Sequence, residues 1–467
     1  MARNIPLQLF AVIMIGLCGC STALLAFESS DLKAGYGRAK INPFVGVKMM
    51  GWGGRDQRGC MGVRDDCFVR ALYLEQGDEK MLIMGMDLCL LSRQHADRYK
   101  TAIGREFDIY PRQILMNVSH NHVAPSSGTW YDGHYETPDW DYLNVIEEGV
   151  VAAAKHARGA ARQASMWVGK GSTKIPVCRR RPKDDGSGTV EWGPYFDGIT
   201  YDELPVCLLK DVSSGDPLCL LFSLSTHASF KGGNEVSAEW PGAAVKQLDK
   251  FLGGEAGLFL QGVGGDAKAY YGGWSGDWDK MEQLGRLAAD DTIRAMAKGL
   301  TQVRPQLRSC IVMTHWPLQP VEKAYFENAV KETEARLEES PLSAGTRYKW
   351  AMQQLKLIER GRLPTAWPIQ LHGIKLAETV RMIGFEGEAV AEWGFFIEKF
   401  YGKDNGLTIP MGYCNGQGAY LPVSRQIPEL GYEVESYPEY DLPSPFAQGM
   451  EAAVLEGLKR LQKRGID

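Results

Sequence analysis

The sequence predicts a mixed α/β fold, with mixed sheets and flanking helices in one large domain and a helical segment inserted in it. Three observations support this class. Short apolar runs of strand length alternate with longer segments of helical spacing. The chain of 467 residues is 44% hydrophobic, which is enough for a substantial core. Between about residues 320 and 360 the alternation stops, and the chain becomes charged and helix-favouring.

The first half of the chain contains strand-like runs and two helical segments. Strands are expected at residues 36–41, 68–74, 81–86 and 114–118, where apolar residues stand between glycine-rich or polar turns. Helices are expected at residues 94–107 and 142–161, where apolar residues recur at helical spacing. The second of these helices is rich in alanine, the best helix former.

Strands and helices alternate more regularly in the second half. Strands are expected at residues 165–168, 204–210, 218–224 and 257–261, and helices at 241–251 and 281–298. The segment of about 320–360 is predicted to be a helical insertion with a break near Ser340-Pro341, and its charges are interpreted as solvated helix faces. Beyond it we expect strands at 368–376, 379–385 and 407–413, and helices at 389–400 and 444–463. We assign residues 33–467 to a single domain.

Residues 1–26 are predicted to be a signal peptide, with a positive charge near the start and an almost entirely apolar run at residues 5–17. The sequence Leu17-Cys18-Gly19-Cys20 is similar to a bacterial lipobox, in which Cys20 would be lipidated. An ordinary secretory signal is the alternative. We therefore expect an exported protein, either a periplasmic or cell-surface lipoprotein tethered to a membrane surface by its N-terminus, or a secreted protein. The formal charge of −5 gives no overall basic field, so no nucleic-acid partner is expected.

Of the ten cysteines, two lie in the predicted signal peptide, which leaves eight. Cys89, Cys207 and Cys219 lie in apolar strand-like runs, where a free thiol packs as a small hydrophobic group. Cys60 and Cys67 lie close together in a glycine-rich loop, and we predict that they form a disulfide bridge.

Two stretches place histidines where apolar runs end: N-V-S-H-N-H-V-A-P from residue 117 and S-L-S-T-H-A-S-F from residue 223. A strand end holds an imidazole rigidly while the loop beyond it stays open to substrate. His120 and His122 share one face if the strand continues through them. His120, His122 and His227 are therefore candidate metal ligands. For each of them alone, a hydrogen-bonded structural histidine is the commoner alternative.

Five motifs follow one another in a recognisable order. They read G-V-R-D-D-C-F-V-R-A-L (62–72), S-H-N-H-V-A-P (119–125), R-R-R-P (179–182), S-A-E-W-P-G (237–242) and L-Q-G-V-G-G-D (260–266). This ordered set resembles the catalytic domain of the neutral/alkaline, non-lysosomal ceramidases. The family versions run approximately as D-x-L-x-x-R-A, T-H-T-H-S-G-P, N-R-S or N-R-R, A-D-Y-P-G and Q-G-x-x-G-D. The resemblance implies hydrolysis of the amide of an N-acyl lipid, ceramide being the family's substrate.

The resemblance also implies a zinc site. Carried over by motif, the ligands would be His120, His227, Glu388 in F-E-G-E-A and Tyr420 in N-G-Q-G-A-Y-L-P. The same carry-over makes His122 the neighbouring histidine on the substrate side, Arg180 the arginine that lines the pocket, and Tyr432 the tyrosine that contacts the substrate amide. Arg179 and Arg181 remain alternatives for the arginine.

These residue types suit zinc hydrolysis. Two imidazoles, a carboxylate and a phenolate form a donor set for Zn²⁺ at about 2.0–2.2 Å, and the ion would lower the pKa of a bound water to about 7. A phenol normally titrates at about 10, so Tyr420 either binds as a phenolate because of the metal's charge or acts as a hydrogen-bonding neighbour. In this hypothesis Tyr432 or Arg180 helps to stabilise the oxyanion, and His122 protonates the leaving amine.

The chain departs from the family at one chemically important position. The family has a serine shortly after the G-D, whereas this chain reads Gly265-Asp266-Ala267-Lys268-Ala269, with Lys268 in the place of the serine. This difference leaves three hypotheses open: a hydrolase of an N-acyl lipid, a zinc hydrolase of another amide or ester, and a non-catalytic ligand-binding relative with the same fold.

Overall fold

The structure is a computed structural model and describes residues 31–52, 58–128, 139–338, 341–402 and 406–467. The predicted signal peptide, with Cys20, lies outside the described residues. Among the described helices, none combines the length and the apolar character needed to cross a bilayer.

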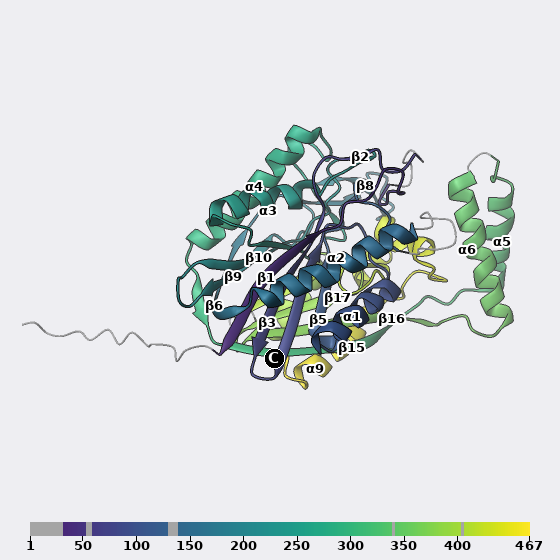
Figure 1. The fold of residues 1–467 in the computed structure, drawn as a ribbon. Coiled ribbons are helices and arrows are strands. Elements are labelled where there is room, and N and C mark those ends of the chain that lie inside the picture. The colour runs from purple at the N-terminus through teal and green to yellow at the C-terminus, as the bar shows by residue number, and fades with distance from the viewer. Residues whose placement is uncertain (1–30, 53–57, 129–138, 339–340, 403–405) are drawn as a thin grey trace, which may run out of the picture.

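A large sheet runs through the domain in the order β12-β10-β9-β6-β1-β3-β4-β5, with β14 paired to β6 (Figure 1). Neighbouring strands are antiparallel except in the pairs β10–β12 and β4–β5. The strands are β1 (Leu32–Lys40), β3 (Phe68–Gln76), β4 (Glu79–Met86), β5 (Ile114–Val118), β6 (Arg162–Ser172), β9 (Glu203–Asp211), β10 (Pro217–Leu224), β12 (Gly257–Gln261) and β14 (Thr301–Val303).

A second sheet packs against the first. Its strands, in order, are β15 (Pro305–Pro317), β16 (Ala366–Ala377), β17 (Val380–Phe385) and β19 (Leu407–Met411). One core cluster contains buried side chains of both sheets, among them Leu72 and Ile83 from the first and Ile374 and Met382 from the second. The two sheets therefore share a core, and burial of their apolar faces stabilises the domain.

Three small sheets complete the strand structure. They join β13 (Ala267–Ala269), β7 (Pro176–Pro182) and β8 (Val190–Tyr195); β11 (Glu235–Val236) and β2 (Gly62–Val63); and β18 (Glu388–Ala389) and β20 (Tyr420–Leu421). β7, β8 and the long strand β15 were not predicted from the sequence, because polar and charged residues interrupt their apolar alternation.

Helices cover both sheets. α1 (Arg93–Phe107) contacts α2 (Trp140–Gly159), which lies along β1 and β3; α3 (Glu239–Leu252) and α4 (Trp278–Ala297) pack together over β12, β9 and β6. α7 (Glu392–Tyr401) contacts β19, and α9 (Met450–Gln462) packs on β15. The short helices are α8 (Tyr432–Glu435), η1 (Pro111–Gln113), η2 (Ser424–Gln426) and η3 (Tyr437–Tyr440). The helix predicted at residues 444–463 corresponds to α9, which begins later, at Met450.

The inserted helical segment is a hairpin of α5 (Lys323–Glu334) and α6 (Pro341–Glu359), which projects from the body at the right of Figure 1. It connects β15 to its antiparallel neighbour β16. The hairpin has its own small core, which includes Phe326 and Trp350. The predicted class, a mixed α/β domain with an inserted helical segment, is confirmed.

The predicted bridge between Cys60 and Cys67 is wrong: both thiols are buried and free. Backbone hydrogen bonds hold the two residues to different parts of the chain, Cys60 to Val47 and Cys67 to Ile41. The Cys60 thiol instead contacts the carbonyl oxygen of Gly62 at 3.5 Å.

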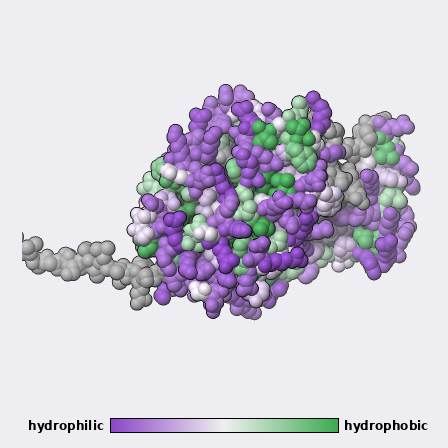
Figure 2. Space-filling view, in the orientation of Figure 1, coloured by the Kyte–Doolittle hydropathy of each residue, from purple (hydrophilic) through white to green (hydrophobic). Residues whose placement is uncertain are grey.

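The face of the molecule shown in Figure 2 is mostly hydrophilic, with scattered apolar residues.

Candidate metal centre

The loops that follow β5 and β10 lie side by side, and each carries a histidine of the candidate site. Asn121 and Ala228 form a parallel bridge, and the amide of His122 donates to the carbonyl of Ala228 at 2.9 Å. Asn117, near the end of β5, fixes this arrangement. Its side-chain amide donates to the carbonyls of Gln261 (3.1 Å) and Gly412 (2.9 Å), and its carbonyl oxygen accepts from the amide of Gln261. The ends of β5, β12 and β19 are thereby joined at one place.

His120, His227 and Glu388 meet at this place. The Oε2 atom of Glu388 lies 3.2 Å from Nε2 of His120 and 3.2 Å from Nε2 of His227. All three residues are buried, and their ligand atoms lie within 4.8 Å of one another. In a tetrahedral zinc site with bonds of about 2.0–2.2 Å, ligand atoms lie about 3.3–3.6 Å apart. The spacing of the three donors therefore fits a single metal ion.

The outer nitrogen of each imidazole is held by the backbone. Nδ1 of His120 lies 3.0 Å from the carbonyl oxygen of Cys89, and Nδ1 of His227 lies 2.8 Å from that of Gly264 and 3.0 Å from that of Ala267. A carbonyl oxygen only accepts, so each Nδ1 carries a proton, and Nε2 is the ring nitrogen that faces the centre. Metal-binding histidines are oriented in this way. Burial, together with Arg179 and His120, lowers the pKa of His227 to about 3, which keeps the ring neutral.

Glu388 is completely buried, and two side chains donate to its Oε1 atom: Tyr440 at 2.9 Å and Gln417 at 2.7 Å. Burial alone would raise the pKa of this carboxyl, but the neighbouring His120 and His227 bring it well below its usual value. No lysine or arginine in the described part of the chain forms an ion pair with Glu388. An ionised carboxylate buried beside two imidazoles, with no lysine or arginine of the described residues paired to it, is costly unless a cation is present. The donor set thus fits a bound divalent cation.

The backbone is strained around this centre. His120 has a φ of 56°, Tyr413 of 58° and Asn415 of 60°. Non-glycine residues rarely adopt this left-handed conformation, and it persists where the surrounding structure enforces it. The Tyr413 ring lies 4.7 Å from that of His120, and its hydroxyl is 3.4 Å from Oε2 of Glu388. Strain is therefore concentrated at the donor cluster.

Tyr420 reaches the same centre because β20 pairs in parallel with β18, with Tyr420 opposite Glu388. Its hydroxyl lies 3.3 Å from Nε2 of His227, and the two rings are stacked at an interplanar angle of 8°. Burial raises the pKa of the phenol well above its usual value, although Arg179 opposes that shift. In the absence of a metal, this residue is a neutral phenol beside the donor cluster.

His122 and Tyr432 stand on the solvent side of these residues. Nε2 of His122 lies 3.0 Å from Nε2 of His120, and the ring of Trp52 packs edge-on against His122 at 5.3 Å. Burial, with His120 and His227 nearby, lowers the pKa of His122 well below its usual value. The Tyr432 ring lies 5.4 Å from that of Tyr420, and its hydroxyl donates to Glu439 at 2.8 Å. Tyr432 is 37% exposed.

The arginine that reaches the centre is Arg179 and not Arg180. Nη1 of Arg179 lies 3.0 Å from Nε2 of His227, and its Nε donates to Glu433 at 2.6 Å. Arg180 contacts the other oxygen of Glu433 at 2.7 Å and also Glu429 at 3.2 Å. Successive residues of a strand face opposite sides, and the register of β7 shifts between Cys178 and Arg180. The arginine that faces the metal centre therefore depends on an irregularity that the sequence motif does not reveal.

Lys268, for which the motif resemblance implies a serine in the family, lies near this centre. It belongs to β13 and forms a parallel bridge with His227. Its Nζ atom lies 5.2 Å from the ring centroid of Trp52 and 5.8 Å from that of Trp274. Lys268 is 6% exposed, and burial together with Arg179 lowers its pKa to about 8.

Tyr440, Gln417, Tyr413 and Arg179 complete the site, and sequence reasoning did not single them out. Tyr440 follows Glu388 by 52 residues, with no motif that ties it to Glu388. Gln417 lies within the N-G-Q-G-A-Y-L-P motif that was used for Tyr420, and Arg179 was an alternative within the R-R-R-P motif, so both had a signal in the sequence.

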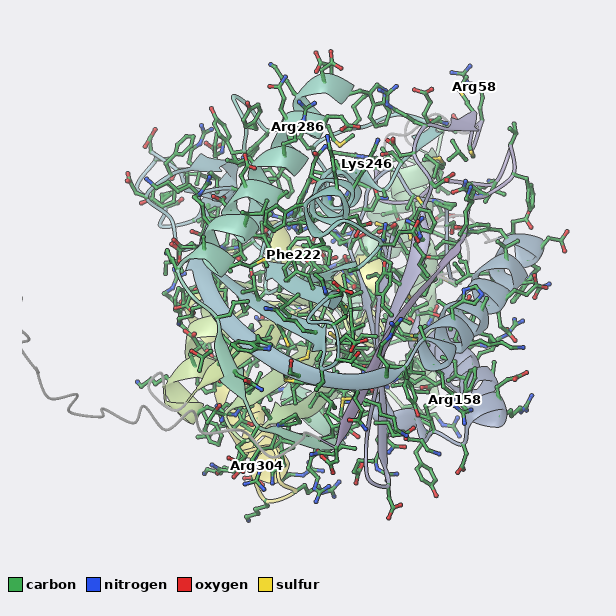
Figure 3. All side chains as sticks on the ribbon, turned by 60° about the vertical axis from the view of Figure 1, so that its left-hand side comes forward. Arg58, Arg158, Phe222, Lys246, Arg286 and Arg304 are labelled. Carbon is green, nitrogen blue, oxygen red and sulfur yellow. The ribbon has the colours of Figure 1, made fainter. Side chains whose placement is uncertain are left out.

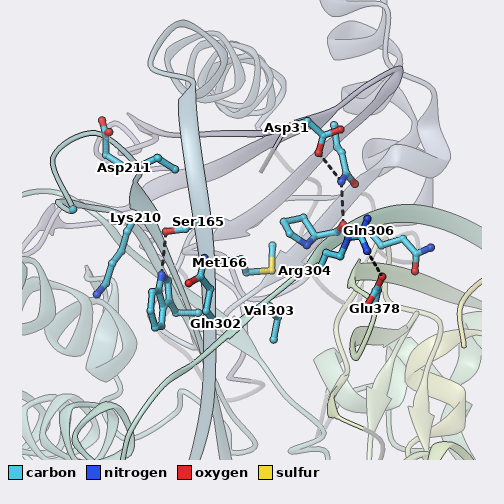
Figure 4. A pocket seen from close by; sticks show the side chains of 15 residues that line it. Asp31, Ser165, Met166, Lys210, Asp211, Gln302, Val303, Arg304, Gln306 and Glu378 are labelled. Atoms are coloured by element: carbon cyan, nitrogen blue, oxygen red, sulfur yellow. Dashed lines mark hydrogen bonds and ion pairs between the residues drawn. The ribbon is translucent and has the colours of Figure 1, made fainter. Parts of the chain in front are cut away.

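A separate hollow of about 930 Å³ lies among residues such as Asp31, Ser165, Lys210 and Arg304 (Figure 4). It is lined mainly by polar and charged residues at the ends of β1, β3, β6 and β9, and none of the candidate site residues lines it. It offers none of the histidine and glutamate donors of the metal centre.

Comparison with known proteins identifies the fold. The chain is similar to the crystal structure of neutral ceramidase from Pseudomonas aeruginosa and to a structure of ceramidase complexed with C2. In both cases the TM-score is 0.71 at 15% sequence identity, over 93% of this chain and 75% of the other. No family model and no curated protein matches the sequence. The fold expected from the motifs is confirmed: the chain has the fold of neutral ceramidase.

Proposed function

We propose that this protein is an exported zinc-dependent hydrolase that cleaves the amide bond of an N-acyl lipid, as in the conversion of ceramide to a sphingoid base and a fatty acid. The observation that carries the proposal is the convergence of His120, His227 and Glu388, with both Nε2 atoms 3.2 Å from one carboxylate oxygen. The likeness in fold to neutral ceramidase supports it.

His120, His227 and Glu388 would hold the ion, and Tyr420 would be its fourth ligand or a hydrogen-bonding neighbour. When bound, zinc supplies a water of lowered pKa and polarises the substrate carbonyl. Nδ1 contacts with backbone carbonyls keep both imidazoles aimed at the centre, and Tyr440 and Gln417 hold Glu388. This rigidity preorganises the site.

Amide hydrolysis breaks the C–N bond, transfers the oxygen of water to the acyl carbon and leaves a proton on the amine. Nη1 of Arg179 is 3.0 Å from Nε2 of His227, so its guanidinium is near enough to stabilise negative charge on the carbonyl oxygen. Tyr432 would contact the substrate amide. His122, 3.0 Å from His120, is the group proposed to take up a proton from the attacking water and to transfer it to the leaving amine, because burial keeps the free ring neutral.

Exposed aromatic side chains surround the approach to the centre. Trp52, Trp192 and Tyr432 are 37%, 49% and 37% exposed. Trp192 contacts the Tyr432 ring at 5.5 Å and lies 4.3 Å from the guanidinium of Arg179. Partly exposed aromatic rings of this kind suit the apolar part of an acyl substrate.

Zinc content tests the metal site. We expect about one zinc per chain in the purified protein and a sharp loss in His120→Ala and in His227→Ala. His156→Ala is a matched control, because His156 is exposed on α2 and contacts only the carbonyl of Arg38 among the described residues. A wild type that binds no zinc, or the same loss in the control, would contradict the proposal.

Substrate tests then separate the possible reactions. The zinc-loaded protein is incubated with a fluorescent N-acyl sphingosine and, in parallel, with short-chain amides and esters. Release of the fatty acid from the lipid substrate supports the proposal. Cleavage of only the short substrates would support a zinc hydrolase of another amide or ester and would contradict an N-acyl lipid as the substrate. No cleavage of any substrate by zinc-loaded protein would favour a non-catalytic binding protein.

A further inference from the structure

We propose that Lys268 and Arg179 form a subsite for a carboxylate on the amine part of the substrate, so that among N-acyl lipids an N-acyl amino acid is hydrolysed in preference to an uncharged one. This inference rests on the proposed amide hydrolysis and narrows its substrate class. It makes Lys268 a specificity-determining residue.

The two cations lie on neighbouring strands of a small sheet. In the antiparallel pair of β7 and β13, Lys268 stands opposite Val177, and Arg179 follows Val177 by two residues. The amide of Arg179 donates to the carbonyl of Asp266, two residues before Lys268, at 2.9 Å, so the pairing of the two strands extends to Arg179. Diagonal neighbours of this kind lie about 7–8 Å apart, within reach of long side chains. Lys268 and Arg179 therefore flank one point, beside His227, to which Lys268 is bridged.

Lys268 forms no ion pair with a carboxylate of the described residues, although the charge of the buried Glu239 acts on it. The Lys268 side chain is 6% exposed. The indole faces of Trp52 and Trp274 at 5.2 and 5.8 Å compensate only part of the desolvation cost of a buried ammonium group. A substrate carboxylate in contact with Nζ would supply the missing partner.

Arg179 contributes an unused donor beside the same centre. It is 2% exposed, its Nε atom donates to Glu433, and its Nη1 atom contacts His227. Its buried Nη2 atom has no hydrogen-bond partner among the described residues. A buried charged donor without a partner is costly, and a carboxylate oxygen would satisfy it.

The charged residues around Lys268 favour a ligand group with a single negative charge. Arg179 and Arg180 share the carboxylate of Glu433, and Arg180 also pairs with Glu429. Two arginines are thus matched by two glutamates, and among the described residues neither glutamate forms an ion pair with Lys268, on which the buried Glu239 acts only through its charge. One carboxylate neutralises Lys268, whereas a dianionic phosphate would bring excess negative charge close to Glu388.

The test compares two substrates that differ in this group alone. N-lauroylglycine and N-lauroylethanolamine have the same acyl chain and amide, but one carries a carboxylate where the other carries a hydroxymethyl group. For the zinc-loaded full chain we expect kcat/KM to be about 10- to 100-fold higher for N-lauroylglycine, as hydrogen bonds to charged groups imply. Lys268→Met should abolish the preference, and Lys268→Arg should retain most of it. Lys246→Met is the matched control, since Lys246 is exposed on α3 (Figure 3).

A binding measurement on metal-free protein provides a second readout. Trp52 and Trp274 border Lys268, so quenching of tryptophan fluorescence reports on binding of N-lauroylglycine. We expect Kd to rise at least about tenfold in Lys268→Met and in Lys268→Gln, but not in Lys246→Met. Far-ultraviolet circular dichroism identifies any variant that fails to fold. If Lys268→Met or Lys268→Gln fails to fold, the Kd of Lys268→Arg is compared with that of the wild type instead.

The outcomes separate this inference from the proposed function. Equal hydrolysis of both substrates, or a preference unchanged in Lys268→Met, overturns the carboxylate subsite and leaves the hydrolase intact. Binding of N-lauroylglycine that depends on Lys268, without hydrolysis of either compound, supports the subsite and contradicts the hydrolase. Laurate that binds as tightly as N-lauroylglycine, with the same dependence on Lys268, overturns the inference because the cations would then serve the acid product.

Discussion

At the scale of single residues, Glu388 connects the metal centre to its surroundings. One carboxylate oxygen lies between the two imidazoles, and the other accepts from Tyr440 and Gln417. Those two donors fix the carboxylate plane, so the position of Oε2 depends on side chains that do not themselves face the histidines. Outer contacts of this kind typically change metal affinity 10- to 100-fold.

We therefore expect Tyr440→Phe to raise the Kd for zinc about 10- to 100-fold, because the ring is retained while the hydrogen bond to Glu388 is lost. Competition with a chromophoric chelator measures this Kd. Tyr142→Phe is the control: that buried hydroxyl donates to the carbonyl of Ile41 on another part of the chain. Equal zinc affinity in both variants would show that the Tyr440 hydroxyl has no part in the site.

At the scale of secondary-structure elements, close contacts decide how the helices sit on the sheets. α2 lies on β1 through Gly35 and Gly37, where a Cβ atom would come within 2.1 Å of the carbonyl oxygen of Ala157 and 2.3 Å of its amide nitrogen. Any side chain at these positions would push the helix backbone away from the strand. The helix can cover the sheet closely only because both residues are glycine.

Gly37→Ala should destabilise the fold by about 1–3 kcal/mol or more, as overpacking against backbone atoms does. Urea denaturation measures the change in the free energy of unfolding. Gly62→Ala, in β2, is the matched control, because a Cβ there meets no atom within 4 Å and the residue has no positive φ. Similar stability of the two variants would contradict this account of the contact between α2 and β1.

The helical hairpin is attached through residues near Tyr440. The side-chain amides of Gln353 and Gln354 on α6 donate to the carboxyl of Asp441 at 2.5 and 3.0 Å, and Trp350 donates to the carbonyl of Leu442. Burial raises the pKa of Asp441 to about 6, although both glutamines oppose that shift. In the folded protein Asp441 therefore keeps its proton at pH values where it has already lost it in the unfolded chain.

This shift gives a pH dependence of defined sign. The contribution of Asp441 to hairpin stability is full below the unfolded pKa of 3.8 and is lost as the pH rises through about 6. Hydrogen exchange of α6 amides, corrected for intrinsic rates, should show more opening at pH 7 than at pH 4. Asp441→Asn should remove this difference, whereas Asp290→Asn, on the exposed face of α4, should keep it. A wild type with equal opening at both values would refute the assignment.

At the scale of the whole molecule, the proposed zinc site joins segments that are far apart in the sequence. His120, His227 and Glu388 follow strands of both sheets, and Tyr420 comes from the pair β18–β20. A ligand that binds only the folded state stabilises it, by about 2.7 kcal/mol at a free concentration of 100 times Kd. Zinc would therefore stabilise the assembly of both sheets.

Removal of zinc should lower the Tm of the wild type, and added zinc should restore it in a concentration-dependent way. Calorimetry of chelator-treated and zinc-loaded protein measures the shift. His227→Ala should show no response to the chelator, and His156→Ala should respond as the wild type does. A wild-type Tm that is independent of zinc would mean that the four segments are held without the ion.

The sequence by itself determined the local elements and the order of the motifs. Periodic apolar residues define a strand or a helix through contacts that span only a few residues, so β5, β12, α4 and the helical insertion were predictable. The histidines at strand ends and the carried-over Glu388 and Tyr420 indicated a zinc site, and the structure brings these side chains together.

Only the tertiary structure decided which neighbours complete the site. Arg179 faces His227 because of a register shift in β7, and Tyr440 reaches Glu388 across 52 residues through the packing of η3. The absence of a bridge between Cys60 and Cys67 likewise follows from hydrogen bonds to two different segments. These contacts depend on strand register and on long-range packing. Neither can be predicted from the residue types and their spacing within one segment.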